Sequence, residues 1–421
     1  MKRNGSVLSL VFVFFLLSCT LAFAGGYEIY EHGARAIGMA GAYTAIAEGP
    51  SAVFYNPAGI TGNAGLQIGL GTALIKPIGS FTSAQGVKTD QESQLYTPLH
   101  LYATYQINEK LTAGFGFFTP FGLGTGWPED WSGKYGGVKT ELQTFFLNPT
   151  LAYQATPRLS LAVGFDYILS NVELGRKIPI MNPANPAQIV GETDLKLTGD
   201  GDAMSFNVGL LFKASEKVQA GLSYRHSADI EYDGDVEFTA PAPFAALFPN
   251  GGGGAELHMP SVLAAGISYM PMEKWTFAAD VNWFGWSGAD SIAITFDTPF
   301  GNPAAPTTAS ALIQEYEDTF ILRLGAEYQL SEVLALRAGY GYDQSPLQDE
   351  HLSATLPGAN RNDLAMGLGY TLGNVDIDAA YFVVLFAERT SENQGQEYFL
   401  LREGHYNTTA HIMNVSVGYR F

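Results

Sequence analysis

The chain has 421 residues, of which 13% are aromatic and 48 are glycine, while only 15% are charged. This charged fraction is well below the usual quarter of a soluble domain. The formal net charge of −19 argues against a nucleic-acid partner. It is compatible with a cell surface whose lipopolysaccharide leaflet is bridged by divalent cations. A periplasmic β protein, a secreted one and a membrane-spanning barrel remain open.

The first 24 residues have the pattern of a signal peptide. Lys2 and Arg3 precede an apolar core over 7–17, and Ala22-Phe23-Ala24 is a small-x-small cleavage site. A lipobox-like stretch ending at Cys19 is the alternative. Cleavage after Ala24 removes the only cysteine, so the mature chain is predicted to have no disulfide and no thiolate metal site.

Residues 25–63 do not have the pattern of a regular element. This region contains "AVFYNPAGITG" at 52–62, which combines glycine, proline, asparagine and aromatic residues. Neither a helix interior nor a strand interior accommodates this mixture.

From residue 64 onward, residues alternate between apolar and small or polar types. In the final "HIMNVSVGYRF", Met413, Val415 and Val417 share one parity, and Asn414 and Ser416 share the other. Such alternation predicts strands with two unlike faces. No apolar run approaches the length of a transmembrane helix.

The small residues and scattered charges of the second face suit a crowded barrel interior, whereas the apolar face suits lipid. Aromatics end many of the strands, as membrane interfaces favour. Six short turns separate longer loops, which predicts fourteen strands, and the terminal Phe421 fits the signal read by the barrel assembly machinery. A soluble all-β protein is the alternative. The six short turns lie at 106–112, 153–160, 212–219, 269–276, 328–335 and 370–377.

An ordered series of motifs resembles the FadL family of outer-membrane transporters for long-chain fatty acids and hydrophobic compounds. The motifs are "GARAIGMAGAYTAIAEGPSAVFYNPAGI", "FGLGTGWPEDWSGKYG", "TELQTFFLNPTLAYQATPRLSLAVGFDYI", "WTFAADVNWFGWS" and "LRAGYGYDQSPL". The resemblance implies an all-β fold, a fourteen-stranded transmembrane barrel over 64–421, with residues 25–63 as a hatch that plugs the lumen.

The resemblance further implies a lateral exit. In the family, the triplet that matches Asn56, Pro57 and Ala58 lies near an inward kink of the third strand, and substrate leaves through the resulting gap into the membrane. The third strand is expected at 111–121. Gly114 and Gly116 lack side chains there, and Pro120 removes a ladder donor, so a local break is plausible.

Parity predicts an apolar lumen. Phe118, Phe146, Phe382, Val384 and Phe386 are expected to point inward and to bind an apolar ligand, although packing against the hatch is an equal alternative. The apolar segments 177–191 and 239–254 are expected to be exposed outer loops that collect amphiphiles, with a glycine tail that can also be disordered.

A fatty-acid carboxylate needs a cation. Arg176, expected just after the fifth strand, matches a basic position of the fatty-acid binders in the family. The second basic position, before the tenth strand, instead has Glu317 and Asp318. This departure leaves neutral alkyl or aromatic hydrocarbons as alternative substrates. A second group of inward charges is expected to brace barrel and hatch: Asp280, Arg323, Glu327, Arg337 and Asp378.

The sequence therefore predicts a passive, monomeric outer-membrane transporter of hydrophobic molecules, most simply long-chain fatty acids. No catalytic residue, cofactor or metal site is predicted, because the seven histidines form no metal-spaced pair and accompany no serine elbow. The alternatives are a hydrocarbon channel that uses the same route, a structural or adhesive surface barrel, and a lipid hydrolase.

Overall fold

The computed structural model describes residues 26–182, 184–391 and 403–421. The predicted signal peptide, including Cys19 and the expected cleavage site, lies outside the described residues. The barrel predicted from residue 64 begins its first strand at Leu66.

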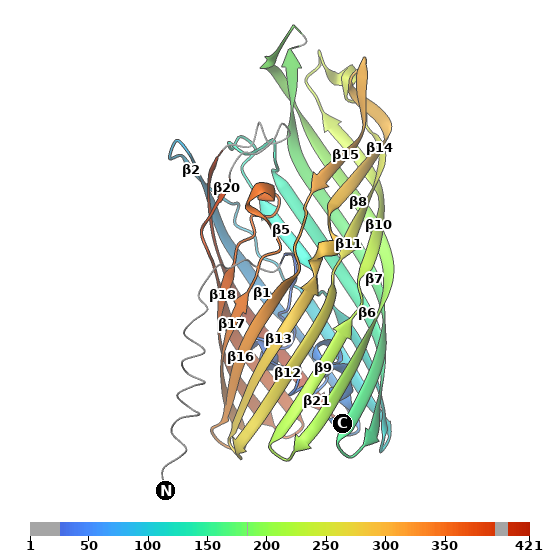
Figure 1. The fold of residues 1–421 in the computed structure, drawn as a ribbon, viewed down its shortest axis with the longest axis vertical. Helices are drawn as coiled ribbons and strands as arrows, with labels where there is room; N and C mark the ends of the chain where they lie inside the picture. The colour runs from blue at the N-terminus through green and yellow to red at the C-terminus, as the bar shows by residue number, and fades with distance from the viewer. Residues whose placement is uncertain (1–25, 183, 392–402) are drawn as a thin grey trace.

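The described strands form one closed antiparallel barrel, shown in Figure 1. Fourteen wall strands surround the lumen, as predicted, and five of them consist of two labelled pieces. In wall order the strands are β1 (Leu66–Ser83), β3 (Leu99–Asn108), β4 (Leu111–Phe118) with β5 (Gly122–Gly126), β6 (Lys139–Thr156), β7 (Leu159–Asn182), β8 (Asn185–Ser215), β9 (Val218–Arg225) with β10 (Ala228–Thr239), β12 (Ser261–Met272) with β11 (Gly251–Met259), β13 (Trp275–Gly285) with β14 (Ser291–Asn302), β16 (Thr319–Gln329) with β15 (Ala305–Ile313), β17 (Leu334–Asp343), β18 (Arg361–Leu372), β19 (Val375–Phe386) and β21 (Gly404–Arg420).

The barrel closes between its first and last strands. β1 and β21 pair without interruption from Gln67 opposite Arg420 to Ser83 opposite Gly404. The predicted alternation is confirmed on β21, where Met413 is 56% exposed on the outer face and Asn414 is 1% exposed on the inner face. Short strands β2 (Lys88–Asp90) and β20 (Arg389–Ser391) add to β1 and β21.

Of the two segments expected to be exposed outer loops, 177–191 is largely strand, whereas 240–250 of the second lies outside the strands and is mostly exposed, as expected. Residues 177–182 continue β7, residues 185–191 begin β8, and these strands rise together with β14 and β15 above the other wall strands in Figure 1. Gly251–Gly254 open β11 and pair with β10, so the glycine tail is ordered. Phe248, expected to be exposed, is buried against Phe300. The expectation of a loop at 177–191 was wrong because alternating residues continue the ladder beyond the lipid-facing belt.

The N-terminal residues 26–63 occupy the lower half of the barrel (Figure 1) and are mostly buried. They contain two one-turn helices, α2 (Ala34–Ile37) and α3 (Ala52–Tyr55), followed by the 3₁₀ helix η1 (Pro57–Gly62). Among the described residues, no helix has both the length and the apolar character needed to cross a membrane. Three further 3₁₀ turns are η2 (Ala245–Leu247), η3 (Trp286–Gly288) and η4 (Asp349–His351).

Charged side chains of the wall hold this N-terminal segment. The carboxylate Oδ2 of Asp280 accepts hydrogen bonds from the backbone N–H groups of Tyr43 at 2.8 Å and Thr44 at 2.7 Å. Arg323 donates to the carbonyl of Ala40 at 3.0 Å and lies 4.0 Å from the ring centre of Tyr30. These contacts satisfy backbone groups that a short irregular segment leaves without helix or sheet partners.

A second set of charges forms a chain of ion pairs on the same segment. Arg35 pairs with Glu327 at 2.9 Å, Glu327 also accepts from Arg337, and Arg337 pairs with Asp378. The bracing contacts expected of the inward charges are therefore present between the N-terminal segment and the wall.

Candidate functional site

The third wall strand breaks between β4 and β5. Phe118 is still opposite Phe146 of β6, but the next paired residue, Gly122, is opposite Gln143. Between these two pairs, three residues on the broken strand, 119–121, therefore face two on its neighbour, 144–145. The third strand, expected at 111–121 with a local break, ends its first piece at Phe118, and Pro120, which cannot donate to a ladder, lies in the break.

The N-terminal segment takes over the backbone partners at this break. The N–H of Ile29 donates to the carbonyl of Pro120 at 2.8 Å, and the N–H of Gly122 donates to the carbonyl of Tyr27 at 2.9 Å. Glu28 lies opposite Phe121 in an isolated antiparallel bridge. The break is thus covered from inside by residues 27–29.

An inner cavity of about 490 Å³ adjoins the break. Val384, Phe386 and Ile412 line it from the inward faces of β19 and β21. The outward-facing Phe117 and Phe145, whose rings stack at 6.0 Å, line the same cavity. The cavity is therefore bounded by residues from both faces of the barrel wall.

An outer cavity of about 410 Å³ lies above it, among the strands that extend beyond the rest of the wall. Its lining is largely apolar and includes Ile292, Ile294 and Leu312. The two cavities meet at four residues that line both: Tyr27, Leu123, Leu142 and Leu356.

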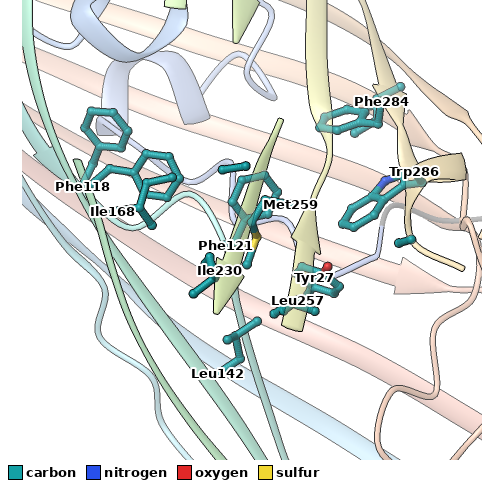
Figure 2. Close-up of a cluster of buried hydrophobic side chains, with 14 of the residues drawn as sticks. Tyr27, Phe118, Phe121, Leu142, Ile168, Ile230, Leu257, Met259, Phe284 and Trp286 are labelled. Carbon is teal, nitrogen blue, oxygen red and sulfur yellow. The ribbon is translucent and has the colours of Figure 1, made fainter. Parts of the chain in front are cut away.

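Aromatic packing fixes the junction between the cavities. Figure 2 shows Tyr27 beside Leu257 and Trp286, with Phe121 nearby. The Tyr27 ring centre is 4.8 Å from that of Trp286 and 6.1 Å from that of Phe121. The Tyr27 hydroxyl donates to the carbonyl of His258 at 2.8 Å, which positions this ring between the cavities.

The predicted ligand-binding residues divide into two groups. Val384 and Phe386 line the inner cavity, and Arg176 lines the outer cavity. Arg176 lies within β7 rather than after it, because that strand continues to Asn182.

The remaining three predicted residues line neither cavity. Phe118 stacks on Phe146 at 5.8 Å, and the Arg225 guanidinium lies 5.2 Å from the Phe118 ring centre. Phe382 is 3% exposed and packs in the cluster that contains Ala34 and Ile37 of α2. In these three cases the inward ring packs against the N-terminal segment or a neighbouring strand.

The triplet Asn56, Pro57 and Ala58 lies away from the break. The Asn56 amide donates to the carbonyl of Leu210 on β8 at 3.0 Å, and the triplet packs over Gly209. This placement differs from the expected one beside the kink of the third strand, because the residues that contact the break are 27–29.

The two glycines expected at the lateral gap lie within a regular ladder. Gly114 pairs with Thr150 and Gly116 with Asn148 on β6, so neither opens the wall. Both make room for Val53 of α3, whose methyl carbons lie about 3.0 Å from the position of an added Cβ. In the fold, these two glycines allow the N-terminal segment to approach the wall closely.

Sequence reasoning missed the residues at the cavity junction. Tyr27 precedes the first of the motifs that resemble the family, and Leu356 lies in a connection between strands. Only the alternation of Leu142 on β6 gave a usable signal for its inward position.

The cavities differ in charge. Arg176 and Lys177 line the outer cavity together with Asp235, whereas Glu28 and Glu31 line the inner cavity together with Arg361. Enclosure in the barrel desolvates both glutamates and raises the pKa of each carboxyl, that of Glu28 more strongly. In the part of the chain that the structure describes, no group of three His, Cys, Asp or Glu side chains is placed to hold a metal ion.

Comparison with known proteins gives a consistent set of similarities. Residues 15–421 match the profile of a family described as outer membrane protein transport protein (OMPP1/FadL/TodX). The 47 kDa outer membrane protein of Pasteurella multocida is 26% identical over 95% of both chains. The long-chain fatty acid transport protein of Salmonella typhi is 23% identical over 90% of this chain and 92% of its own length.

Solved structures share the fold. A Pseudomonas aeruginosa FadL homologue superposes with a TM-score of 0.85 at 17% identity, covering 94% of this chain and all of its own. The P. putida toluene transporter TodX gives a TM-score of 0.72 at 18% identity, covering 89% of this chain and 94% of its own.

Proposed function

Because the chain belongs to the outer membrane protein transport family that includes FadL and TodX, we propose that it is a passive outer-membrane channel for hydrophobic molecules, in the first instance long-chain fatty acids. The relative from Salmonella typhi is named for long-chain fatty acid transport and TodX for toluene transport, so hydrocarbons are the second candidate substrates.

The observation that supports this function is the series of two apolar cavities. The outer one lies among the strands that extend beyond the wall, the inner one lies at the break between β4 and β5, and four residues line both. Moving an alkyl chain from water into such a lining contributes roughly 0.8 kcal/mol per CH₂ group. The free energy of an apolar ligand is therefore lower in both cavities than in water, so its entry needs no energy source.

In the proposed route, ligand enters the outer cavity, passes Tyr27, and leaves through the wall beside Phe117 and Phe145. Residues 26–63 act as the hatch. Because the N–H of Ile29 donates to the carbonyl of Pro120 and the N–H of Gly122 donates to the carbonyl of Tyr27, a shift of residues 27–29 changes the width of this exit.

The first experiment measures uptake of labelled oleate and labelled toluene by cells that lack their own transporter of this type. A Gly122→Phe variant fills the inner cavity, because a Cβ at this position points at the flexible end of Ile29 and the residue lines that cavity. Ala113→Phe, on the outward parity of β4, is the matched control.

We expect Gly122→Phe to abolish uptake and Ala113→Phe to retain it, with equal amounts of folded barrel in the outer membrane. Uptake by Gly122→Phe at the normal rate would exclude the exit through the wall. If neither ligand enters faster than in cells without the barrel, transport is excluded and a structural surface barrel is favoured.

The second experiment tests hatch movement with a reversible crosslink. An added Cβ on Gly114 lies 3.0 Å from Cγ2 of Val53. This matches the distance of about 3 Å between a Cβ and the far sulfur that disulfide bond lengths produce. The paired variant Val53→Cys, Gly114→Cys should lose uptake when oxidised and regain it on reduction, whereas each single variant should be unaffected by reductant. Full uptake by the oxidised pair would contradict a moving hatch at α3.

A further inference from the structure

The charged groups of the inner cavity differ from those that a carboxylate ligand requires. Glu28 and Glu31 line this cavity on either side of Ile29, at the covered break in the wall. Glu141 also borders it, but lies on the outward parity of β6 and pairs with Lys139 at 3.4 Å. The N-terminal segment thus brings two acidic groups to the place where a ligand would leave the lumen.

The cations near these glutamates have other partners. Arg361, the one cation among the residues that line the inner cavity, donates to Asp343 at 2.8 Å. Arg323 is turned toward the Ala40 carbonyl and the Tyr30 ring. Among the residues that the structure describes, neither Glu28 nor Glu31 forms an ion pair. The positive charges of Arg361 and Arg323 lower the pKa of both carboxyls, but desolvation has the larger, opposite effect.

An anionic ligand would face two costs in this compartment. Its carboxylate would lose water in an apolar lining, which is unfavourable without a paired cation. It would also lie beside two further carboxyls, and like charges at one site oppose ionisation. Desolvation raises the pKa of Glu28 and Glu31, so their repulsion of a ligand carboxylate acts when they are ionised and strengthens as the pH rises.

Building on the proposed transport function, we propose that Glu28 and Glu31 make the inner cavity selective for uncharged ligands. Neutral alkyl or aromatic molecules cross it directly. A fatty acid reaches the outer cavity as an anion and crosses the inner one only in its protonated form. Charge selection at the exit is a property of this chain's own residues, separate from the apolar lining that gives affinity.

The test compares two ligands of equal chain length, labelled oleate and labelled oleyl alcohol, at an external pH of about 8, where the unperturbed carboxyl is ionised. Initial uptake is measured for the wild type, for the double variant Glu28→Gln, Glu31→Gln, and for Glu48→Gln. Glu48 belongs to the same segment but its side chain is 61% exposed and pairs with Arg35, so it controls for a lost carboxyl elsewhere.

We expect the wild type to take up the alcohol faster than oleate. The double variant should raise the ratio of oleate to alcohol uptake by about tenfold, the effect of one pKa unit of charge interaction, with alcohol uptake unchanged. Glu48→Gln should keep the wild-type ratio. Alcohol uptake with an unchanged ratio in the double variant would overturn the charge selection alone. Absence of uptake for both ligands in the wild type would overturn the transport function and the selection with it.

Discussion

At the scale of single residues, glycines in the wall are the points at which the N-terminal segment approaches the barrel most closely. An added Cβ on Gly221 would lie 2.1 Å from the backbone carbonyl oxygen of Thr44, and one on Gly339 would lie 2.3 Å from the carbonyl carbon of Met39. Backbone atoms of a held segment cannot move aside as a side-chain end can. The small residues on the inward face of the strands are therefore required for this close contact with the N-terminal segment.

We predict that Gly221→Ala destabilises the folded protein by about 1–3 kcal/mol through overpacking. The measurement is the temperature at which the folded band converts to the unfolded band in gel electrophoresis. Gly69→Ala is the control, because its added Cβ would meet Pro50 at an ordinary 3.5 Å. Equal transition temperatures for both variants would contradict the close approach.

Asp280 provides a second prediction at this scale. Its carboxylate accepts from two buried backbone N–H groups, and Asp280→Ala leaves both without this partner. We expect a loss of about 2 kcal/mol or more and faster cleavage of residues 26–63 by added protease. Asp280→Asn retains one acceptor oxygen in the same place and should preserve most of the protection. Protection of the alanine variant at the wild-type level would show that Asp280 does not hold the segment.

At the scale of elements, β14 and β15 form part of the outer cavity through a cross-strand pair. Ile292 lies opposite Leu312, and both line the cavity. Substituting both by serine removes apolar surface from the proposed entry compartment. Because 1.4 kcal/mol corresponds to a tenfold change in binding, we expect half-maximal uptake at about tenfold higher ligand concentration.

The maximal rate should stay unchanged, because the inner cavity and the proposed exit are not altered by these substitutions. Asp297→Ser, on the outward face of β14, is the control for altered expression. A fall in maximal rate with the same half-saturating concentration would place the effect of this pair on exit rather than on entry.

The elements also show which features could be predicted from the sequence. The six short turns correctly predicted fourteen strands. Alternation of period two correctly predicted the inward side of Phe382 and Val384, because the two faces of each strand meet different surroundings. It did not show which inward rings line a cavity. That depends on where residues 26–63 lie in the lumen, and no local pattern records this position.

Two other features were inaccessible for physical reasons. The covered break between β4 and β5 depends on a pairing of residues 27–29 with Pro120 and Gly122, which are about ninety residues apart in sequence. The charge difference between the cavities arises from where separate strands and the N-terminal segment meet. The sequence has Glu317 and Asp318 where a second basic residue was expected, but it did not indicate that Glu28 and Glu31 line the inner cavity.

At the scale of the whole molecule, barrel closure brings the last strand onto the first. The N–H of the terminal Phe421 donates to the carbonyl of Leu66, and its side chain is 68% exposed. An exposed ring at this position contributes little to packing, so we propose that it serves recognition by the barrel assembly machinery. Phe421→Ala should lower the amount of barrel in the outer membrane several-fold. The free energy of unfolding of the barrels that do assemble should remain within about 0.5 kcal/mol of the wild-type value. Normal amounts in the membrane would contradict the recognition role.

The partners of the N-terminal segment have a consequence for assembly. Ala34 donates its N–H to the Ser416 hydroxyl, and Arg35 pairs with Glu327, so the segment made first depends on strands made last. Contacts of such sequence separation form only after the loop between them has closed. Residues 26–63 therefore have no complete binding surface until the final strand is in place. Residues 26–63 are therefore expected to pack in the lumen only when the barrel is closed. In a barrel that lacks its last strand, this segment should remain accessible to proteases.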